Sequence, residues 1–179
     1  MAENHSIEVR LGRRLGRAVR GMGPSERLAS IGALAVFLSM LLPWYRSPIE
    51  ADLVQTGAGA FNFALAALLL TMAAVLFLAV EVGAGYRPPR PLSIGTLLIG
   101  AGVWGGLIAV FEMLDRPQFH FGGVNDDYDI AYGTFVAVAG TVVITVAGIR
   151  RRAREIIARH GPAQIKRQNQ VEEKEGDDE

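Results

Sequence analysis

The sequence predicts an all-α, integral membrane protein, folded as an up-down-up-down four-helix bundle with its N- and C-termini in the cytoplasm. Three observations favour this fold class: four long apolar runs without charge, an uneven distribution of Lys and Arg around them, and small residues that repeat along them. A helix needs about 20 apolar residues to cross the hydrocarbon core of a bilayer. We expect the four spans at about residues 28–45, 60–81, 92–112 and 130–149.

The positive charges predict the orientation of these spans. Of the 18 Lys and Arg residues, six precede the first span, two lie between the second and third spans, and eight follow the fourth. Only Arg46 and Arg116 fall in the two remaining loops. Cytoplasmic loops carry an excess of Lys and Arg, so both termini and the middle loop are predicted to be cytoplasmic.

Residues 1–25 are predicted to form a basic amphipathic segment. Apolar residues recur there at spacings of three and four between arginines: Ile7, Leu11, Leu15, Ala18 and Met22. Such a segment can lie on an anionic membrane surface. Two interpretations stay open: arginines that only fix the orientation of the first span, which we favour, and specific recognition of lipid. Gly23 and Pro24 then predict a break and a new helix start.

The first span ends in Leu42-Pro43-Trp44-Tyr45. A cleaved signal peptide would end in small residues, so we expect this span to be a retained anchor. Trp44 and Tyr45 are predicted to be interface anchors, because their amphipathic rings favour the boundary between membrane and water.

Helix breakers and charge mark the segments outside the transmembrane domain, which we place at residues 26–149. The turn at 83–91 is rich in Gly and Pro and should end the second span. After the fourth span, Arg150, Arg151, Arg152 and Arg154 predict a basic helix extension, with Gly161-Pro162 as its stop. The rest of residues 150–179 is predicted to be a disordered, acidic cytoplasmic tail.

Small residues predict how the spans pack. Lipid tails are as apolar as Leu, so close packing, rather than burial alone, joins spanning helices. Each of the last three spans has a face of small residues at near-heptad spacing, suited to a left-handed bundle. The predicted packing positions are Ala64, Ala67 and Ala74 in the second span, Gly105 in the third, and Gly133, Ala137 and Gly140 in the fourth. Phe63, Leu69, Leu70 and Met72 are expected to meet lipid.

A glycine motif lies inside the third span. Gly100, Gly102 and Gly105 match the dinucleotide-binding pattern G-x-G-x-x-G. That pattern binds phosphate only between a strand and a helix, where backbone amides are exposed. Within a membrane helix we interpret the glycines as packing residues, so no cofactor is predicted.

Two carboxylates lie on the predicted inward faces. Glu81 and Glu112 fall near opposite edges of the membrane, and ionisable groups in spans are functional candidates. At the edge such groups are easily solvated or paired, so we favour a structural role over proton or ion handling. No charged residue lies near the middle of a span, and the spans lack the central Pro that marks broken transporter helices. Only polar residues could line a path there: Asn62, Thr71, Thr96, Thr141 and Thr145.

The second outer loop carries an acidic cluster. Asp126, Asp127 and Asp129 are weak candidates for binding a hard cation through oxygen ligands, with Asp115 and His120 nearby. The cluster lacks the glycine and the distal glutamate of an EF-hand loop. We therefore favour a plain acidic loop and predict no metal site. The chain has no cysteine and no recognisable catalytic motif, so we do not expect an enzyme.

The motif Leu42-Pro43-Trp44-Tyr45 resembles the end of the first helix in a group of small, uncharacterised four-span bacterial membrane proteins, common among actinobacteria. The start of the second span, the turn Asp115-Arg116-Pro117 and the glycine at Gly133 are also similar to that group. The likeness covers roughly residues 28–150. It implies a bacterial plasma membrane location and a four-span fold, and it implies no activity.

These features together predict a structural or accessory membrane protein. It would act through contacts with membrane lipid, a membrane-protein partner or a second copy of itself, and not with nucleic acid. The alternative is a small transporter or channel subunit, which needs a polar path through the bundle. A third reading is a membrane enzyme with an acidic site on the outer face.

Overall fold

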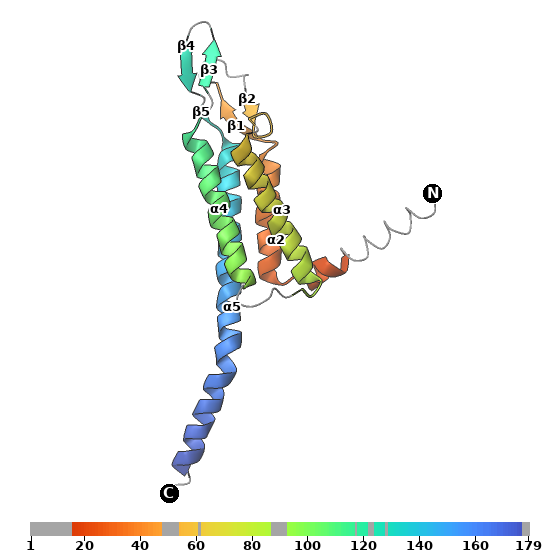
Figure 1. Ribbon diagram of the computed structural model, residues 1–179, viewed down its shortest axis with the longest axis vertical. Helices are drawn as coiled ribbons and strands as arrows, with labels where there is room; N and C mark the ends of the chain where they lie inside the picture. Colours follow the sequence, from red (N-terminus) through yellow and green to blue (C-terminus); the bar gives the residue numbers. More distant parts are fainter. Residues whose placement is uncertain are drawn as a thin grey trace, which may run out of the picture.

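A computed structural model describes residues 16–47, 54–60, 62–86, 93–116, 118–121, 124–127 and 129–176, with side chains for all of these except 118–127 and 159–176. The chain is mostly helical (Figure 1). The helices are α2 (Pro24–Ser39), α3 (Phe63–Gly83), α4 (Ile94–Leu114) and α5 (Tyr132–Gly176), and residues 16–21 are also helical. Short strands gather at one end of the helices, called the sheet end here. The opposite end, from which α5 projects, is the tail end.

Three of the described helices are long and apolar enough to cross a membrane: α3, α4 and residues Tyr132–Ala158 of α5. The helix of the predicted first span ends earlier than expected. Helix α2 has 16 residues and ends at Ser39, whereas the sequence predicted helix to residue 45. The main-chain oxygen of Ser39, at the helix end, accepts hydrogen bonds from Leu42 N at 3.0 Å and from the indole Nε1 of Trp44 at 2.7 Å. Pro43 then begins a strand.

Two small antiparallel sheets cap the sheet end, which departs from the all-α expectation. Strand β1 (Pro43–Arg46) lies between β2 (Val54–Thr56) and β5 (Asp129–Ile130), with Tyr45 opposite both Gln55 and Ile130. Strands β3 (Gln118–Phe121) and β4 (Val124–Asp127) form a separate hairpin. These strands have two to four residues each, too short for a periodic pattern in the sequence to reveal them.

The long helix α5 corrects a second expectation. It continues through Gly161 and Pro162 to Gly176, beyond the predicted stop (Figure 1). Proline removes one backbone donor, but Ala, Gln, Lys, Arg and Glu dominate the surrounding residues and favour helix strongly. The predicted disordered tail is therefore helix as far as residue 176. Of the predicted N-terminal segment, residues 1–15 lie outside the described part, and Ala18 and Met22 are buried.

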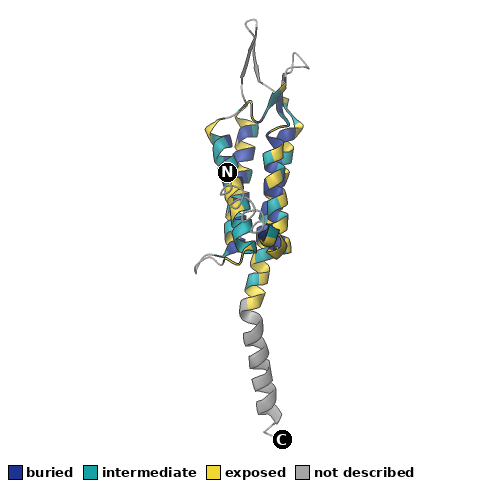
Figure 2. Cartoon of the chain, turned by 90° about the vertical axis from the view of Figure 1, so that its right-hand side faces the viewer, coloured by how far each residue is buried: buried dark blue, intermediate teal, exposed yellow. Residues whose placement is uncertain are grey.

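The four helices lie side by side, with α5 contacting α2 and α4, and with α3 contacting the same two helices. The predicted inward faces of α4 and α5 are buried, including Gly105, Gly133, Ala137 and Gly140 (Figure 2). The buried face of α3 is turned by one residue from the prediction: it consists of Leu65, Leu68, Met72, Val75 and Ala79. Ala74 is exposed, and Ala64 and Ala67 are half-buried. Leu65, Leu68 and Met72 of α3 belong to the apolar core, whereas α5 contacts α2 and α4 through glycines.

Glycines set the close approach of α5 to α2 and α4. A methyl group added at Gly140 would lie 2.8 Å from the main-chain oxygen of Gly32 and 2.7 Å from Val36 Cγ2. On the other side, a methyl group at Gly102 would lie 2.7 Å from the main-chain nitrogen of Thr145. Gly100 has open space around it. The glycine motif in α4 therefore lies within a helix, where Gly102 and Gly105 face neighbouring helices.

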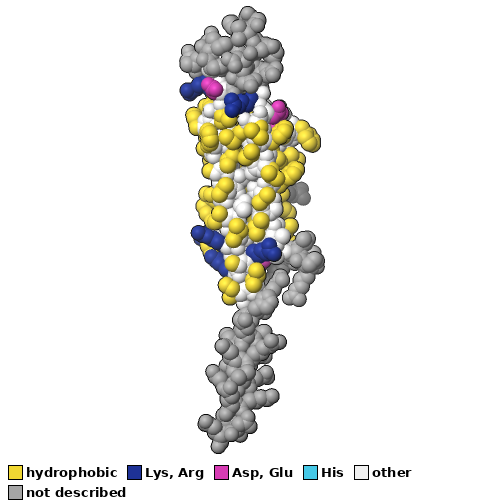
Figure 3. Space-filling view, turned by 90° about the vertical axis from the view of Figure 1, so that its left-hand side faces the viewer, with side chains coloured by type: hydrophobic (Ala, Val, Ile, Leu, Met, Phe, Trp, Pro, Cys, Tyr) yellow, Lys and Arg dark blue, Asp and Glu magenta, His cyan; other side chains and the backbone are white. Residues whose placement is uncertain are grey.

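The surface matches a membrane environment over the middle of the molecule. Figure 3 shows one face on which hydrophobic side chains cover the helices between charged groups at the two ends. Phe63, Leu70, Phe77, Leu107 and Phe111 are among the exposed large side chains. Water would not favour so many exposed apolar groups, whereas lipid tails solvate them.

Candidate functional site

The two carboxylates predicted from the sequence lie at opposite ends of the molecule. Glu112 lies in the last turn of α4 at the sheet end, and only 2% of its surface is exposed. Glu81 lies near the end of α3 at the tail end and is half-buried. The structure therefore does not bring the two together in one site, and Glu112 is the more enclosed of the two.

Side chains from β1 and from the start of α3 hold Glu112. The Asn62 amide Nδ2 donates to both of its carboxylate oxygens, at 2.9 Å to Oε1 and 3.1 Å to Oε2. The Tyr45 hydroxyl donates to the main-chain oxygen of Glu112 at 2.8 Å and lies 3.4 Å from Oε2. Asn62 also caps α3, because its Oδ1 accepts from the main-chain nitrogen of Leu65 at 2.9 Å. The cluster thus joins β1, α3 and α4.

Burial fixes Tyr45 as a hydrogen-bond donor. The side chain is fully buried, and burial raises the pKa of the Tyr45 phenol well above its usual range, with the neighbouring Glu112 carboxylate adding to the effect. The phenol therefore stays protonated at neutral pH. The sequence predicted Tyr45 as an anchor among lipid headgroups; its ring instead contacts protein.

Trp44 is also enclosed by protein rather than by headgroups. A methyl group added at Gly57 or Gly133 would lie 2.7 Å from atoms of the indole ring, so both glycines make room for it. The main-chain oxygen of Trp44 accepts from Ala131 N at 2.8 Å and from Thr134 Oγ1 at 3.2 Å. Strand β1 therefore binds the start of α5, and the aromatic pair organises the sheet end of the fold.

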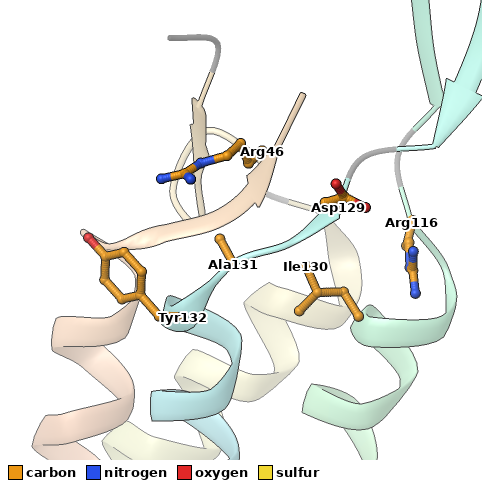
Figure 4. Close-up of a pocket in the computed structure, with 6 residues that line it drawn as sticks. All are labelled: Arg46, Arg116, Asp129, Ile130, Ala131 and Tyr132. Atoms are coloured by element: carbon orange, nitrogen blue, oxygen red, sulfur yellow. The ribbon is translucent and has the colours of Figure 1, made fainter. Parts of the chain in front are cut away.

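Two pockets open at the sheet end. One, of about 360 Å³, has Glu112 among its lining residues, with Tyr45, Gln55, Gly59, Ala60, Asn62, Asp115 and Arg116. The second, of about 490 Å³, is lined by Arg46, Arg116, Asp129, Ile130, Ala131 and Tyr132 (Figure 4). In Figure 4 the guanidinium of Arg46 points away from Asp129. Arg116 lines both pockets, so the two are neighbours.

The predicted acidic cluster is spread over the strands. Asp126 and Asp127 lie in β4, where side chains are outside the described part, as is that of His120 in β3. Asp129 begins β5 and is exposed. Among the described residues, no three metal-binding side chains lie close enough together to hold an ion.

A second fully buried carboxylate, Glu26, lies in the first turn of α2 at the tail end and is 2% exposed. Its Oε1 lies 3.0 Å from Arg151 Nη1 of α5, and Arg151 Nε donates to Glu155 Oε1 at 3.2 Å. Neither Glu26 oxygen has a well-directed hydrogen bond in the described part of the chain. The contact with Arg151 is therefore mainly one of opposite charge. Sequence reasoning missed this pair, because 125 residues separate partners that meet only once α2 and α5 are packed.

Polar side chains in the middle of the helices bond to their own backbone. Thr71 Oγ1 donates to the main-chain oxygen of Ala67, Thr141 Oγ1 to that of Val138, and Thr145 Oγ1 to that of Thr141. Apolar side chains fill the space between the helices: Leu65, Leu68, Met72, Leu98, Ile108 and Ile144. The threonines therefore do not line up as a polar path through the described core.

Comparisons with protein-family models, with curated proteins and with solved structures find no match for this chain. The function is therefore inferred from the geometry alone. It offers a closed apolar interior, a helix that projects from the tail end, and a polar cluster around Glu112 beside a pocket at the sheet end.

Proposed function

We propose that the chain is a structural or accessory protein of the bacterial plasma membrane, acting through contacts with lipid, a membrane-protein partner or a second copy of itself. The observation that carries this proposal is the closed apolar interior between the helices. A transporter or channel subunit needs a polar route across the membrane, and the central threonines are already bonded to their own helices. The long projection of α5 supports the proposal, because it extends helical surface beyond the other helices.

We further propose that α2 crosses the membrane as well, which gives a four-span up-down-up-down bundle with cytoplasmic termini. Helix α2 spans about 24 Å at 1.5 Å per residue, and residues 40–46 extend the segment towards the sheet end. Its exposed face is apolar, with Ile31, Leu34 and Leu38 at 50% to 62% exposure. The arginines around the tail end support a cytoplasmic location for that end. This fold is also that of the bacterial group with the Leu-Pro-Trp-Tyr motif.

Cysteine labelling tests the topology directly, because the chain has no native cysteine. We expect V54C, at the sheet end, to react in intact cells with a maleimide that cannot cross the membrane. We expect V19C and A158C to react only after permeabilisation. Both termini would then lie inside, as four spans require. Labelling of V19C in intact cells would contradict a membrane-spanning α2, and the cysteine-free parent chain is the control for background.

Measurements of ion flux and of cross-linking test the proposed accessory role. In liposomes, the purified protein is expected to pass protons and potassium no faster than protein-free vesicles do. In native membranes, a photo-cross-linking residue at the exposed position Leu107 is expected to capture a membrane protein or a second copy in a constant ratio. Saturable flux in liposomes would overturn the accessory role and favour the transporter alternative. The buried position Ile144 is the matched control for cross-linking and should capture nothing from outside the chain.

A further inference from the structure

Two carboxylates are fully buried in the described part of the chain, and Glu112 differs from Glu26 in having no positive partner there. Glu26 faces Arg151 at 3.0 Å, whereas the hydrogen-bond donors described for Glu112, Tyr45 and Asn62, are both neutral. No ion pair described in the structure includes Glu112. A buried carboxylate without a counter-charge is costly, because burial removes its hydration and nothing of opposite charge replaces it. A positive charge next to Glu112 would therefore stabilise the site, and the described side chains do not supply one.

Arg116 is the positively charged residue among those that line the pocket, and it bonds elsewhere. Arg116 lines the same pocket, but its side chain is exposed and its Nε donates to the main-chain oxygen of Met113 at 3.3 Å. Asp115 adds a second carboxylate to the pocket wall. The residues that line the pocket thus include two carboxylates and one guanidinium.

We propose that this pocket binds a small molecule carrying a protonated amine, with Glu112 and Asp115 as the anionic partners. An ammonium group carries three N–H donors, and the residues that line the pocket include acceptors for them: the two carboxylates and Gln55, whose Nε2 donates to Gly59 O. A carboxylate can accept about four hydrogen bonds, so the bonds from Asn62 and Tyr45 leave Glu112 capacity for another donor. The volume of about 360 Å³ lies within the ~300–1,000 Å³ range of small-molecule sites.

An amine fits this pocket better than a metal ion does. Hard cations such as calcium take six or more oxygen ligands, and the described residues provide no group of three metal-binding side chains. Arg116 adds selectivity, because it can pair with a carboxylate on an amine that carries one.

The ligand would be held at the sheet end rather than passed across the membrane. Leu65 and Ile108 lie on the core side of Asn62 and Glu112, and both are buried among apolar residues. A bound amine would strengthen a site that already joins β1, α3 and α4. The inference therefore goes beyond the proposed accessory role and adds a ligand to it.

Ligand-dependent thermal stability of the full-length protein in lipid nanodiscs tests the inference. The probes are methylammonium, ethanolammonium, glycine and γ-aminobutyrate. Tetramethylammonium, which has no N–H donor, and acetate, which has no amine, are the negative probes. We expect a saturable rise in the unfolding temperature with the amines, because a ligand that binds only the folded state stabilises it. Stronger binding of the amino acids than of the simple amines would assign Arg116 to the carboxylate.

The variant E112Q should weaken amine binding by at least about tenfold, which corresponds to about 1.4 kcal/mol. Glutamine keeps an oxygen that can accept from Asn62, so the variant should fold. E81Q, which neutralises the half-buried carboxylate at the tail end, is the matched control and should bind as the parent does. If E112Q fails to fold, D115N at the exposed neighbour replaces it and should weaken binding several-fold. No saturable response to any amine at millimolar concentration, or unchanged binding in the neutral variants, would overturn the proposal.

Discussion

Replacing Gly140 with leucine is expected to separate α5 from α2 and to destabilise the protein by about 3 kcal/mol. The reason is a backbone contact: a single added methyl group at Gly140 would already lie 2.8 Å from the main-chain oxygen of Gly32. A backbone atom cannot rotate away as the end of a side chain can, so the helices themselves must shift. The measurement is the unfolding temperature of the purified protein, together with the yield of monodisperse protein from membranes.

The control for this change lies in another helix of the same protein. Gly100 is also a glycine within a span-length helix, but nothing lies within 4 Å of the added methyl position and the residue is exposed. G100L should therefore change stability by no more than about 1 kcal/mol, in the favourable direction, because leucine is the better helix former. If G140L and G100L behaved alike, close packing at Gly140 would not be what holds α5 against α2.

The positions of α4 and α5 could be predicted from the sequence because their packing depends on small residues. Where backbones approach closely, only Gly, Ala and similar residues fit, so the contact face shows in the sequence as a stripe. Helix α3 was predicted one residue out of phase, because its contacts use Leu65, Leu68 and Met72, which also suit a lipid-facing surface. In a membrane helix both faces are apolar, so hydrophobicity alone does not tell them apart.

The sheet end could not be predicted for a different reason. The motif Leu42-Pro43-Trp44-Tyr45 reads as the apolar end of a span, and its aromatic residues suit a membrane interface. Its actual role depends on distant residues: Tyr45 meets Glu112, and the Trp44 ring needs the space left by Gly57 and Gly133. Glu112 was recognised as a candidate from its position, but its partners lie 50 and 67 residues away in the chain. Such contacts leave no periodic signal.

Replacing Arg151 with methionine is expected to be the most damaging single change at the tail end. Glu26 would remain buried at 2% exposure without its positive partner, and Glu155 would lose the same partner. Breaking a buried ion pair by removing one member costs about 3–5 kcal/mol. Arg151 is itself 29% exposed, so solvent screens part of the interaction, and we expect a loss near the lower end of that range.

The adjacent arginine and a double substitution separate charge from packing in this prediction. Arg150 is exposed and forms no ion pair described in the structure, so R150M should change the unfolding temperature little. Adding E26Q to R151M removes the unpaired charge and should recover most of the lost stability, because a neutral amide is far less costly to bury than a carboxylate. A double variant as unstable as R151M alone would mean that the methionine damages packing and that the Glu26–Arg151 pair does not join α2 to α5. Recovery would show that opposite charge holds α2 and α5 together at the tail end.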